Sequence, residues 1–203
     1  MDHIEKELEA GRAVILPTET VYGIFAKALD QEAVDYIYEL KRRPRDKALN
    51  LNVADEKTIR IYSKNQPSYL TKLIHSFLPG PLTIILQANE KVPNWIHSGL
   101  DTVGFRIPAH PKILDLIRKY GPLVGPSANL SGHASGTKYK AIVSEFDQVV
   151  PGIEDDDFLT GQDSTILDIS SSKARILRQG SITKADLLAQ VPELSFEEDE
   201  LPQ

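Results

Sequence analysis

Compact apolar runs and helically spaced apolar residues alternate along most of the chain. The run AVILP at residues 13–17 has no polar interruption and ends at proline, which is typical of a buried strand. Leu49, Leu51 and Val53 alternate with polar neighbours, as the residues of a half-buried strand do. Apolar, β-branched and aromatic content predicts further strands at 82–86, 102–107, 164–170 and 174–180, and from residue 122 onward.

Helix boundaries are marked by capping residues, prolines and glycines. Ile4 and Leu8 lie four residues apart on one face of a predicted N-terminal helix, and Pro44 is expected to end the second helix because proline disfavours a helical residue before it. Thr183 and Asp186 form a predicted capping box at the start of the last helix. Helices are predicted over 2–10, from Asp30 toward Pro44, from about 67 to the PGP at 79–81, and over 111–119, 138–146 and 184–190.

The order of these elements predicts one α/β domain with a mixed sheet over residues 1–190, without an internal repeat or a linker. Residues 191–203 are expected to form a flexible acidic tail, since PELSFEEDELPQ is rich in acids and apolar residues are few.

Composition narrows the possible functions of this 203-residue chain. Because the chain has no cysteine, disulfides, thiolate metal sites and cysteine nucleophiles are excluded. The charged N-terminal segment does not resemble a secretory signal, and no apolar run is long enough to span a membrane, so the cytoplasm is the expected location. The net charge of -6 argues against a protein that binds nucleic acid over its whole surface.

The densest basic segment, residues 41–47, therefore needs an explanation. Lys41, Arg43 and Lys47 are separated by a helix end and a proline, so they can converge on an anion such as a phosphate. A solvated helix end, whose positive charges complement the helix dipole, explains the composition about equally well. A localisation signal or an RNA contact is a further alternative.

Other polar segments follow predicted strands, where α/β proteins often place their binding sites. PTETVYG at 17–23 reads as a loop with two hydroxyls, and GPSANLSG at 125–132 is a loop of small polar residues without a P-loop or dinucleotide pattern. Taken singly, each segment is also explained as an ordinary turn or a surface ion pair. No HExxH or GxSxG motif occurs, and the histidines lack metal-ligand spacing, so we expect the site to position anions and not to use a covalent nucleophile.

Taken in order, seven blocks resemble the YrdC/TsaC family, the L-threonylcarbamoyladenylate synthases, over about residues 10–183. The blocks are PTETVYG, LKRRPRDKAL, PGPLTIIL, TVGFRIP, PLVGPSANLSG, STILDIS and ILRQG. The resemblance implies an α/β fold in which a twisted mixed sheet and flanking helices surround a positively charged concave site. It also implies the single-domain type of the family.

The resemblance implies a reaction in which L-threonine, bicarbonate or CO2, and ATP give threonylcarbamoyl-AMP and pyrophosphate. The product would supply the threonylcarbamoyl group of the adenosine next to the anticodon in tRNA. ATP would be a substrate, a Mg²⁺ ion is expected to accompany it, and separate transfer proteins are expected as partners. Direct tRNA binding is possible within this scheme, and no membrane contact is expected.

The family's site roles carry over to matching motif positions. Lys41 and Arg43 would also stabilise charge during the reaction, whereas Arg42 and Arg45 are expected in solvent. Ala48 and Asn52 replace the proline and histidine of many members, so the Asn52 contact rests on its amide alone. The expected L-threonine ligands are Thr20, Asn52, Arg106, Ser127 and Ser164. The expected ATP ligands are Lys41, Arg43, Lys47, Val103, Asn129, Thr137 and Arg178.

Two other functions compete with the synthase. A double-stranded RNA or tRNA binder, or a ribosome-maturation protein of the same fold, would show salt-dependent RNA affinity and no chemistry. The SAN triplet at 127–129 and the threonine ligands favour the enzyme over that reading. A carbamoyltransferase that uses carbamoyl phosphate is less favoured, since the chain has no zinc-finger or acylphosphatase-like segment.

Overall fold

We describe the protein from a computed structural model, in which residues 3–147 and 149–197 are described. The strands are β1 (Val14–Pro17), β2 (Tyr22–Lys27), β3 (Leu51–Asn52), β4 (Ser63–Lys64), β5 (Leu82–Ala88), β6 (Thr102–Arg106), β7 (Leu123–Val124), β8 (Thr165–Asp168) and β9 (Arg175–Arg178). The α-helices are α1 (His3–Glu9), α2 (Gln31–Lys41), α3 (Glu56–Tyr62), α4 (Leu70–Phe77), α5 (Asn94–His97), α6 (Pro111–Tyr120), α7 (Tyr139–Glu145) and α8 (Lys184–Gln190), and η1 (Asp156–Phe158) is a short 3-10 helix.

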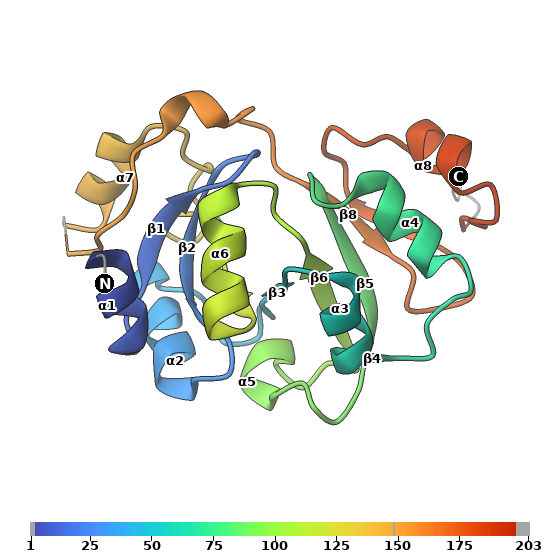
Figure 1. Ribbon diagram of the computed structural model, residues 1–203, viewed down its shortest axis with the longest axis horizontal. Coiled ribbons are helices and arrows are strands. Elements are labelled where there is room, and N and C mark those ends of the chain that lie inside the picture. The colour runs from blue at the N-terminus through green and yellow to red at the C-terminus, as the bar shows by residue number, and fades with distance from the viewer. Residues whose placement is uncertain (1–2, 148, 198–203) are drawn as a thin grey trace, which may run out of the picture.

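The strands form one twisted mixed sheet with helices around it, as Figure 1 shows. Its order is β1-β2-β7-β3-β6-β5-β8-β9, with β4 added beside β5. The pairs β3–β6 and β5–β8 are parallel, and the other pairs are antiparallel. The predicted mixed α/β fold is therefore confirmed.

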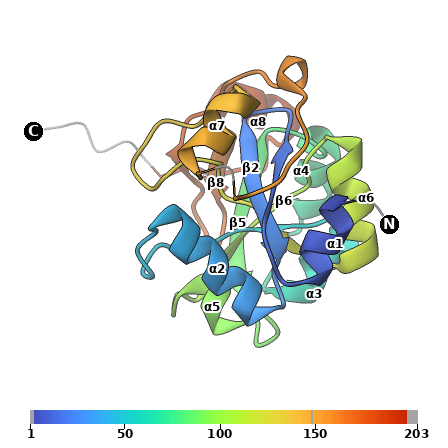
Figure 2. The ribbon, with the colours of Figure 1, turned by 90° about the vertical axis from the view of Figure 1, so that its left-hand side faces the viewer.

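Strand β1 is covered on both faces, which explains its uninterrupted apolar run. Val14 and Leu16 pack with Ile4 and Leu8 of α1 in one cluster, whereas Ile15 belongs to the main core on the other face. Successive strand residues point to opposite faces, so a strand covered on both sides has to be apolar throughout. Figure 2 shows α1 and α6 on one side of β2 and α2 on the other.

The start of β2 corrects the prediction of a loop over 17–23, since Tyr22 and Gly23 already belong to that strand. The two hydroxyls and the glycine resembled a turn, but Gly23 is needed in the strand because a Cβ there would lie 2.5 Å from the Phe25 ring. The prediction also omitted β2 as a strand, and α3, β4 and α5. Of these, α3 buries only Ile59 and so carries almost no apolar periodicity.

Two predicted helix starts are confirmed by their capping contacts. The Asp30 carboxylate accepts a hydrogen bond from the backbone N–H of Ala33 (3.2 Å), and the capping box of Thr183 and Asp186 is present. The second helix ends earlier than expected, however. It ends at Lys41, because Arg42 adopts a left-handed conformation (φ 49°) before Pro44 is reached.

The expected flexible tail begins with residues that pack on the domain. Val191 and Leu194 are buried in the main core, Phe196 forms a β-bridge with Ala174, and Glu193 pairs with Lys72 at 3.1 Å. Packing therefore continues through residue 197, beyond the boundary at 190, and residues 198–203 lie outside the described residues. Within the described chain, none of the helices has the length and apolar character needed to cross a membrane.

Candidate functional site

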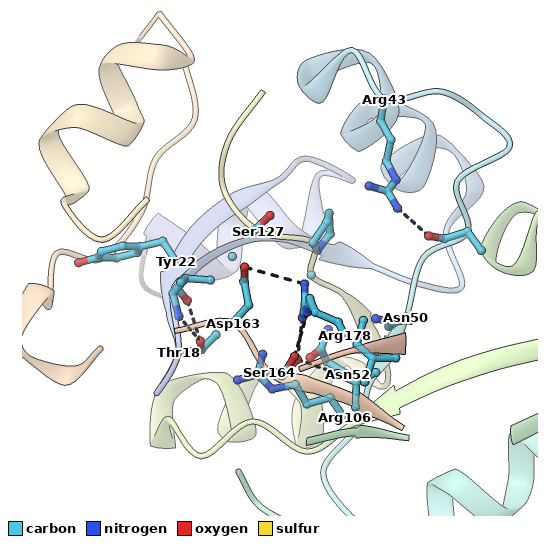
Figure 3. A pocket seen from close by; sticks show the side chains of 17 residues that line it. Thr18, Tyr22, Arg43, Asn50, Asn52, Arg106, Ser127, Asp163, Ser164 and Arg178 are labelled. Atoms are coloured by element: carbon cyan, nitrogen blue, oxygen red, sulfur yellow. Dashed lines mark hydrogen bonds and ion pairs between the residues drawn. The ribbon is translucent and has the colours of Figure 1, made fainter. Parts of the chain in front are cut away.

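A cavity of about 270 Å³ opens where β2 and β7 approach the ends of β3, β5, β6 and β8. Figure 3 shows its side chains converging from these separate segments. Its lining combines three guanidinium groups with hydroxyls and amides, so it suits a polar anionic ligand. The lining residues are Thr18, Val21, Tyr22, Gly23, Arg43, Ala48, Asn50, Asn52, Thr83, Arg106, Gly125, Pro126, Ser127, Asp163, Ser164, Ile166 and Arg178.

Arg106 is held rigidly at the end of β6. Its Nη2 donates to Glu19 Oε1 (2.6 Å) and to the Thr20 hydroxyl (2.8 Å). The other oxygen of Glu19 accepts from the backbone N–H of Ala109 (2.9 Å), which fixes the carboxylate as well. The Arg106 Nε is buried and has no partner among the described residues. An oriented guanidinium that borders a cavity is a ready site for a carboxylate.

Thr18 and Thr20 form a hydroxyl chain behind this arginine. Their oxygens lie 2.8 Å apart, and Thr18 Oγ1 donates to the Val21 carbonyl (2.6 Å). Since Thr18 gives its one hydroxyl proton to the Val21 carbonyl, the Thr20 hydroxyl donates to Thr18 and accepts from Arg106. Thr20 is fully buried behind Arg106, whereas Thr18 lines the cavity.

Arg178 and Ser164 form another part of the lining, where β8 and β9 pair. Arg178 donates from Nε to the Ser164 carbonyl (2.9 Å) and from Nη2 to the Ser164 hydroxyl (3.0 Å). The same hydroxyl lies 3.0 Å from that of Thr83 in β5. Neighbouring strands therefore fix both side chains, which explains why Ser164 is only 2% exposed yet borders the cavity.

The basic segment divides into buried and exposed members. Lys41 is buried, and its Nζ donates to the carbonyl oxygens of Ser127 (2.5 Å) and Asn129, so it joins the end of α2 to the SAN loop. Arg43 lines the cavity, and its Nη2 donates to the Ala48 carbonyl (2.7 Å). Arg42 and Arg45 are exposed, as predicted.

Burial, and secondarily the positive charge of Arg43, lowers the pKa of Lys41 to about 8. In the unfolded chain this lysine titrates near 10.5, so between pH 8 and 10.5 the unfolded state binds more protons than the folded state. The free energy of unfolding therefore rises with pH in that window. Burial favours the neutral form of the Lys41 amine over its charged form. An anion bound nearby would favour the charged form.

We expect this titration to be visible in stability measurements. Relative to Lys41→Met, the wild-type free energy of unfolding should increase by about 2 kcal/mol from pH 7.5 to 9.5, as integrated linkage gives for this pKa difference. Urea unfolding of both proteins at the two pH values measures it. Lys47→Met is the control, because the Lys47 side chain is exposed and its removal should leave the pH slope unchanged. Equal slopes in all three proteins would contradict the prediction.

The structure brings together only part of the predicted site. The predicted residues that line the cavity are Arg43, Asn52, Arg106, Ser127, Ser164 and Arg178. Thr20 and Lys41 lie directly behind it, in contact with its wall. Asn129 is buried, donates to the carbonyls of Leu130 and His133 (2.9 Å each), and leaves its Oδ1 without a partner among the described residues.

Besides Lys41 and Asn129, three further predicted ATP ligands lie outside the cavity lining. Lys47 is exposed, and its carbonyl accepts from Arg43 Nε (3.1 Å). Val103 is buried in β6 opposite Leu86, and Thr137 is half-buried beside Gly161. Their roles stay predictions.

Several residues that line the cavity, and Glu19 behind Arg106, were not identified from the sequence. Glu19 belongs to the same block as Thr20, and Asp163 immediately precedes Ser164. The motifs therefore indicated Thr20 and Ser164 but not the acids beside them. Asn50 and Thr83 lie in strand-like runs. There the alternation of polar and apolar residues predicts the face of the sheet on which a side chain lies, but not whether that side chain binds a ligand. Tyr22 combines a cavity position with a hydroxyl that donates to Asp156 (2.9 Å), which links the site to η1.

Comparison with known proteins adds independent observations. A family model for Sua5, YciO and YrdC proteins, described as "Telomere recombination", matches residues 6–180. The threonylcarbamoyl-AMP synthase of Pyrococcus abyssi is 38% identical over 177 residues, which cover 86% of this chain and 52% of that protein. A putative threonylcarbamoyl-AMP synthase of Methanocaldococcus jannaschii is 37% identical over 90% of this chain and 86% of its own length.

A solved structure shows the same fold. The crystal structure of P. abyssi Sua5 complexed with L-threonine superimposes with a TM-score of 0.85 at 34% identity, over 95% of this chain and 57% of that one. The chain thus spans about half the length of the P. abyssi protein.

Proposed function

Because this chain belongs to the Sua5/YciO/YrdC family, we propose that it makes threonylcarbamoyl-AMP from L-threonine, bicarbonate or CO2, and ATP, with release of pyrophosphate. The observation that carries the proposal is the Arg106 guanidinium, which lines the cavity and is oriented by Glu19 and Thr20. It matches the carboxylate of an amino acid. The threonine complex of the related P. abyssi protein supports this choice of ligand.

The threonine half of the site would consist of Arg106 with the polar groups around it. Ser127, Ser164 and Asn52 line the same cavity and can hydrogen-bond the hydroxyl and carboxylate of threonine. Thr20 would act through Arg106, since its hydroxyl is committed to that side chain. A cavity of about 270 Å³ accommodates a small amino acid, and ATP would extend from it along the cavity mouth.

The ATP half would use the cations at the cavity edge and beside the SAN loop. Arg43 and Arg178 border the cavity, and Lys41 lies beside the Ser127 and Asn129 carbonyls. Lys47, Val103, Asn129 and Thr137 complete the proposed nucleotide contacts. Their spread over separate segments fits a ligand much longer than threonine.

The chemistry needs positioned charges and no enzyme nucleophile. A carbamate oxygen attacks the α-phosphorus, and the bond to the pyrophosphate oxygen breaks. Arginine and lysine side chains would reduce repulsion among the carbamate, the threonine carboxylate and the triphosphate, and stabilise the leaving pyrophosphate. Among the described residues, no group of three or more His, Cys, Asp or Glu side chains is arranged to hold a metal ion. A magnesium ion would take most of its ligands from phosphate and water.

The direct test is threonine-dependent pyrophosphate release. Purified protein is incubated with ATP, bicarbonate and a magnesium salt, with and without L-threonine, and the adenylate product is identified by mass spectrometry. We expect pyrophosphate and the threonylcarbamoyl adenylate only when threonine is present. No increase with threonine would refute the proposed activity, and salt-sensitive RNA binding without chemistry would support the RNA-binding alternative.

Arg43→Ala should weaken ATP binding about 10- to 100-fold, because one charge-assisted phosphate contact is lost. Threonine affinity should change less than twofold, since threonine is assigned to the Arg106 side of the cavity. Titration calorimetry with each ligand measures both. The matched control is Arg42→Ala, which removes the same charge from an exposed neighbour and should leave both affinities near wild type. Equal losses for the two ligands would refute this division of the site.

The biological setting follows from the same proposal. Threonylcarbamoyl-AMP would be consumed by separate proteins that transfer its threonylcarbamoyl group to the adenosine next to the tRNA anticodon. The tRNA would then contact those proteins and need not contact this one. The cytoplasm is the compartment in which ATP, threonine and tRNA are all available.

A further inference from the structure

Asp163 places an acid in a cavity that is otherwise lined by cations and neutral groups. Arg43, Arg106 and Arg178 line this cavity, and Asp163 carries the only carboxylate among its described lining residues. A carboxylate there repels the phosphates and carboxylates that the arginines attract. Its position is useful to a ligand that also presents a positive or proton-donating group.

The Asp163 carboxylate is not required to hold the neighbouring arginine. Arg178 makes its short hydrogen bonds to the carbonyl and hydroxyl of Ser164, at 2.9 and 3.0 Å, whereas its Nη1 lies 3.9 Å from Asp163 Oδ2. The Ser135 hydroxyl lies 3.2 Å from both carboxylate oxygens. These contacts are long for a carboxylate, which can accept about four hydrogen bonds. Asp163 therefore keeps capacity for a donor from the ligand.

The location of Asp163 fits one part of the substrate. Figure 3 shows its carboxylate facing the space between Ser127 and Arg178, and Ser164 follows it in the chain. A threonine whose carboxylate pairs with Arg106 and whose hydroxyl reaches Ser127 or Ser164 lies beside this acid. Of the groups on L-threonine, bicarbonate and ATP, only the threonine ammonium is cationic.

We propose that Asp163 binds the threonine ammonium group and accepts its protons as the carbamate forms, an assignment that rests on the function proposed above. The nitrogen loses one proton when the ammonium becomes an amine. It loses a second as its lone pair forms the C–N bond to CO2 and the electrons of one C=O bond move to oxygen. Asp163 takes these protons one at a time and passes each to water, so that R–NH3⁺ and CO2 give R–NH–COO⁻ and two protons.

The test compares Asp163→Asn with the wild type. Asparagine keeps the shape and removes the acceptor charge, so threonine-dependent pyrophosphate release should fall about 100- to 10,000-fold, the usual contribution of a general base. The residual rate should rise with pH. At higher pH more of the threonine is already a free amine in solution, so its first proton does not have to be removed by the enzyme. Asp163→Glu should recover part of the rate. Asp157→Asn is the control, since it removes a charge from an exposed acid outside the cavity and should leave the rate unchanged.

A binding measurement separates this inference from the proposed function. Wild type should bind L-threonine more tightly than 3-hydroxybutyrate, which is threonine without its amino group, and Asp163→Asn should lose that preference while keeping its ATP affinity. If the wild type releases no pyrophosphate with threonine, the proposed function fails and the binding comparison still decides the role of Asp163. An unchanged preference, an unchanged pH profile, or a defect removed by extra magnesium overturns the inference.

Discussion

Arg106→Gln should abolish measurable threonine saturation, with an affinity loss of about 100-fold or more. The substitution removes the guanidinium that is proposed to pair with the substrate carboxylate, and the loss of its charge-assisted hydrogen bonds accounts for a change of this size. Titration calorimetry and the threonine dependence of pyrophosphate release both measure it. ATP affinity should change little, because the phosphates are assigned to Arg43, Lys41 and Arg178.

The same substitution should lower the free energy of unfolding by about 3 kcal/mol, because it leaves Glu19 without its cation. The two side chains are only 13% and 15% exposed, so water does little to screen the remaining carboxylate. Arg60→Gln breaks an exposed helix pair with Glu56 and should cost less than 1 kcal/mol.

The double variant Arg106→Gln with Glu19→Gln separates the two effects. It should regain most of the stability, since no charge is left unpaired, and remain unable to bind threonine. Recovery of threonine binding in the double variant would mean that Arg106 only neutralises Glu19 and does not contact the substrate.

Local patterns predicted most of the fold because helix caps and strand periodicity are short-range signals. The Thr183 capping box and the two-faced apolar run of β1 are both properties of a few adjacent residues. By contrast, β2 was hidden by a glycine and by a preceding polar turn, and its position becomes evident only when it pairs with β1 and β7. Pairing between distant segments has no local signature.

The candidate site was predictable in its motifs but not in its contacts. Lys41 follows Val34, Ile37 and Tyr38 at helical spacing, so its place on the buried face of α2 could have been read from the pattern. The pair of Glu19 and Arg106 could not, because the two residues lie 87 positions apart and meet only through the sheet. The position of Lys41 therefore depends on the buried face of α2, which is a local pattern. The residue that orients Arg106 depends on the topology of the sheet.

Gly180→Ala should damage both stability and the site, because Gly180 packs against backbone on the opposite strand. An added Cβ would lie 2.4 Å from the Asp163 carbonyl oxygen and from the Thr165 nitrogen, and 2.7 Å from the Ser164 carbonyl carbon. No side-chain rotation relieves these contacts, so the β8–β9 junction has to move. We expect the free energy of unfolding to fall by about 3 kcal/mol, the upper range of overpacking.

The movement would also displace the groups that this junction presents to the cavity. Asp163 and Ser164 lie on the displaced segment, and small displacements of positioned groups are costly to a reaction that depends on orientation. Threonine-dependent pyrophosphate release should fall at least tenfold under conditions where circular dichroism shows the protein still folded. Gly99→Ala is the control, because Gly99 has nothing within 4 Å of an added Cβ and carries only the strain of its φ of +83°. It should lose about 1 kcal/mol of stability and no activity, and equal behaviour of the two variants would show that the junction tolerates the shift.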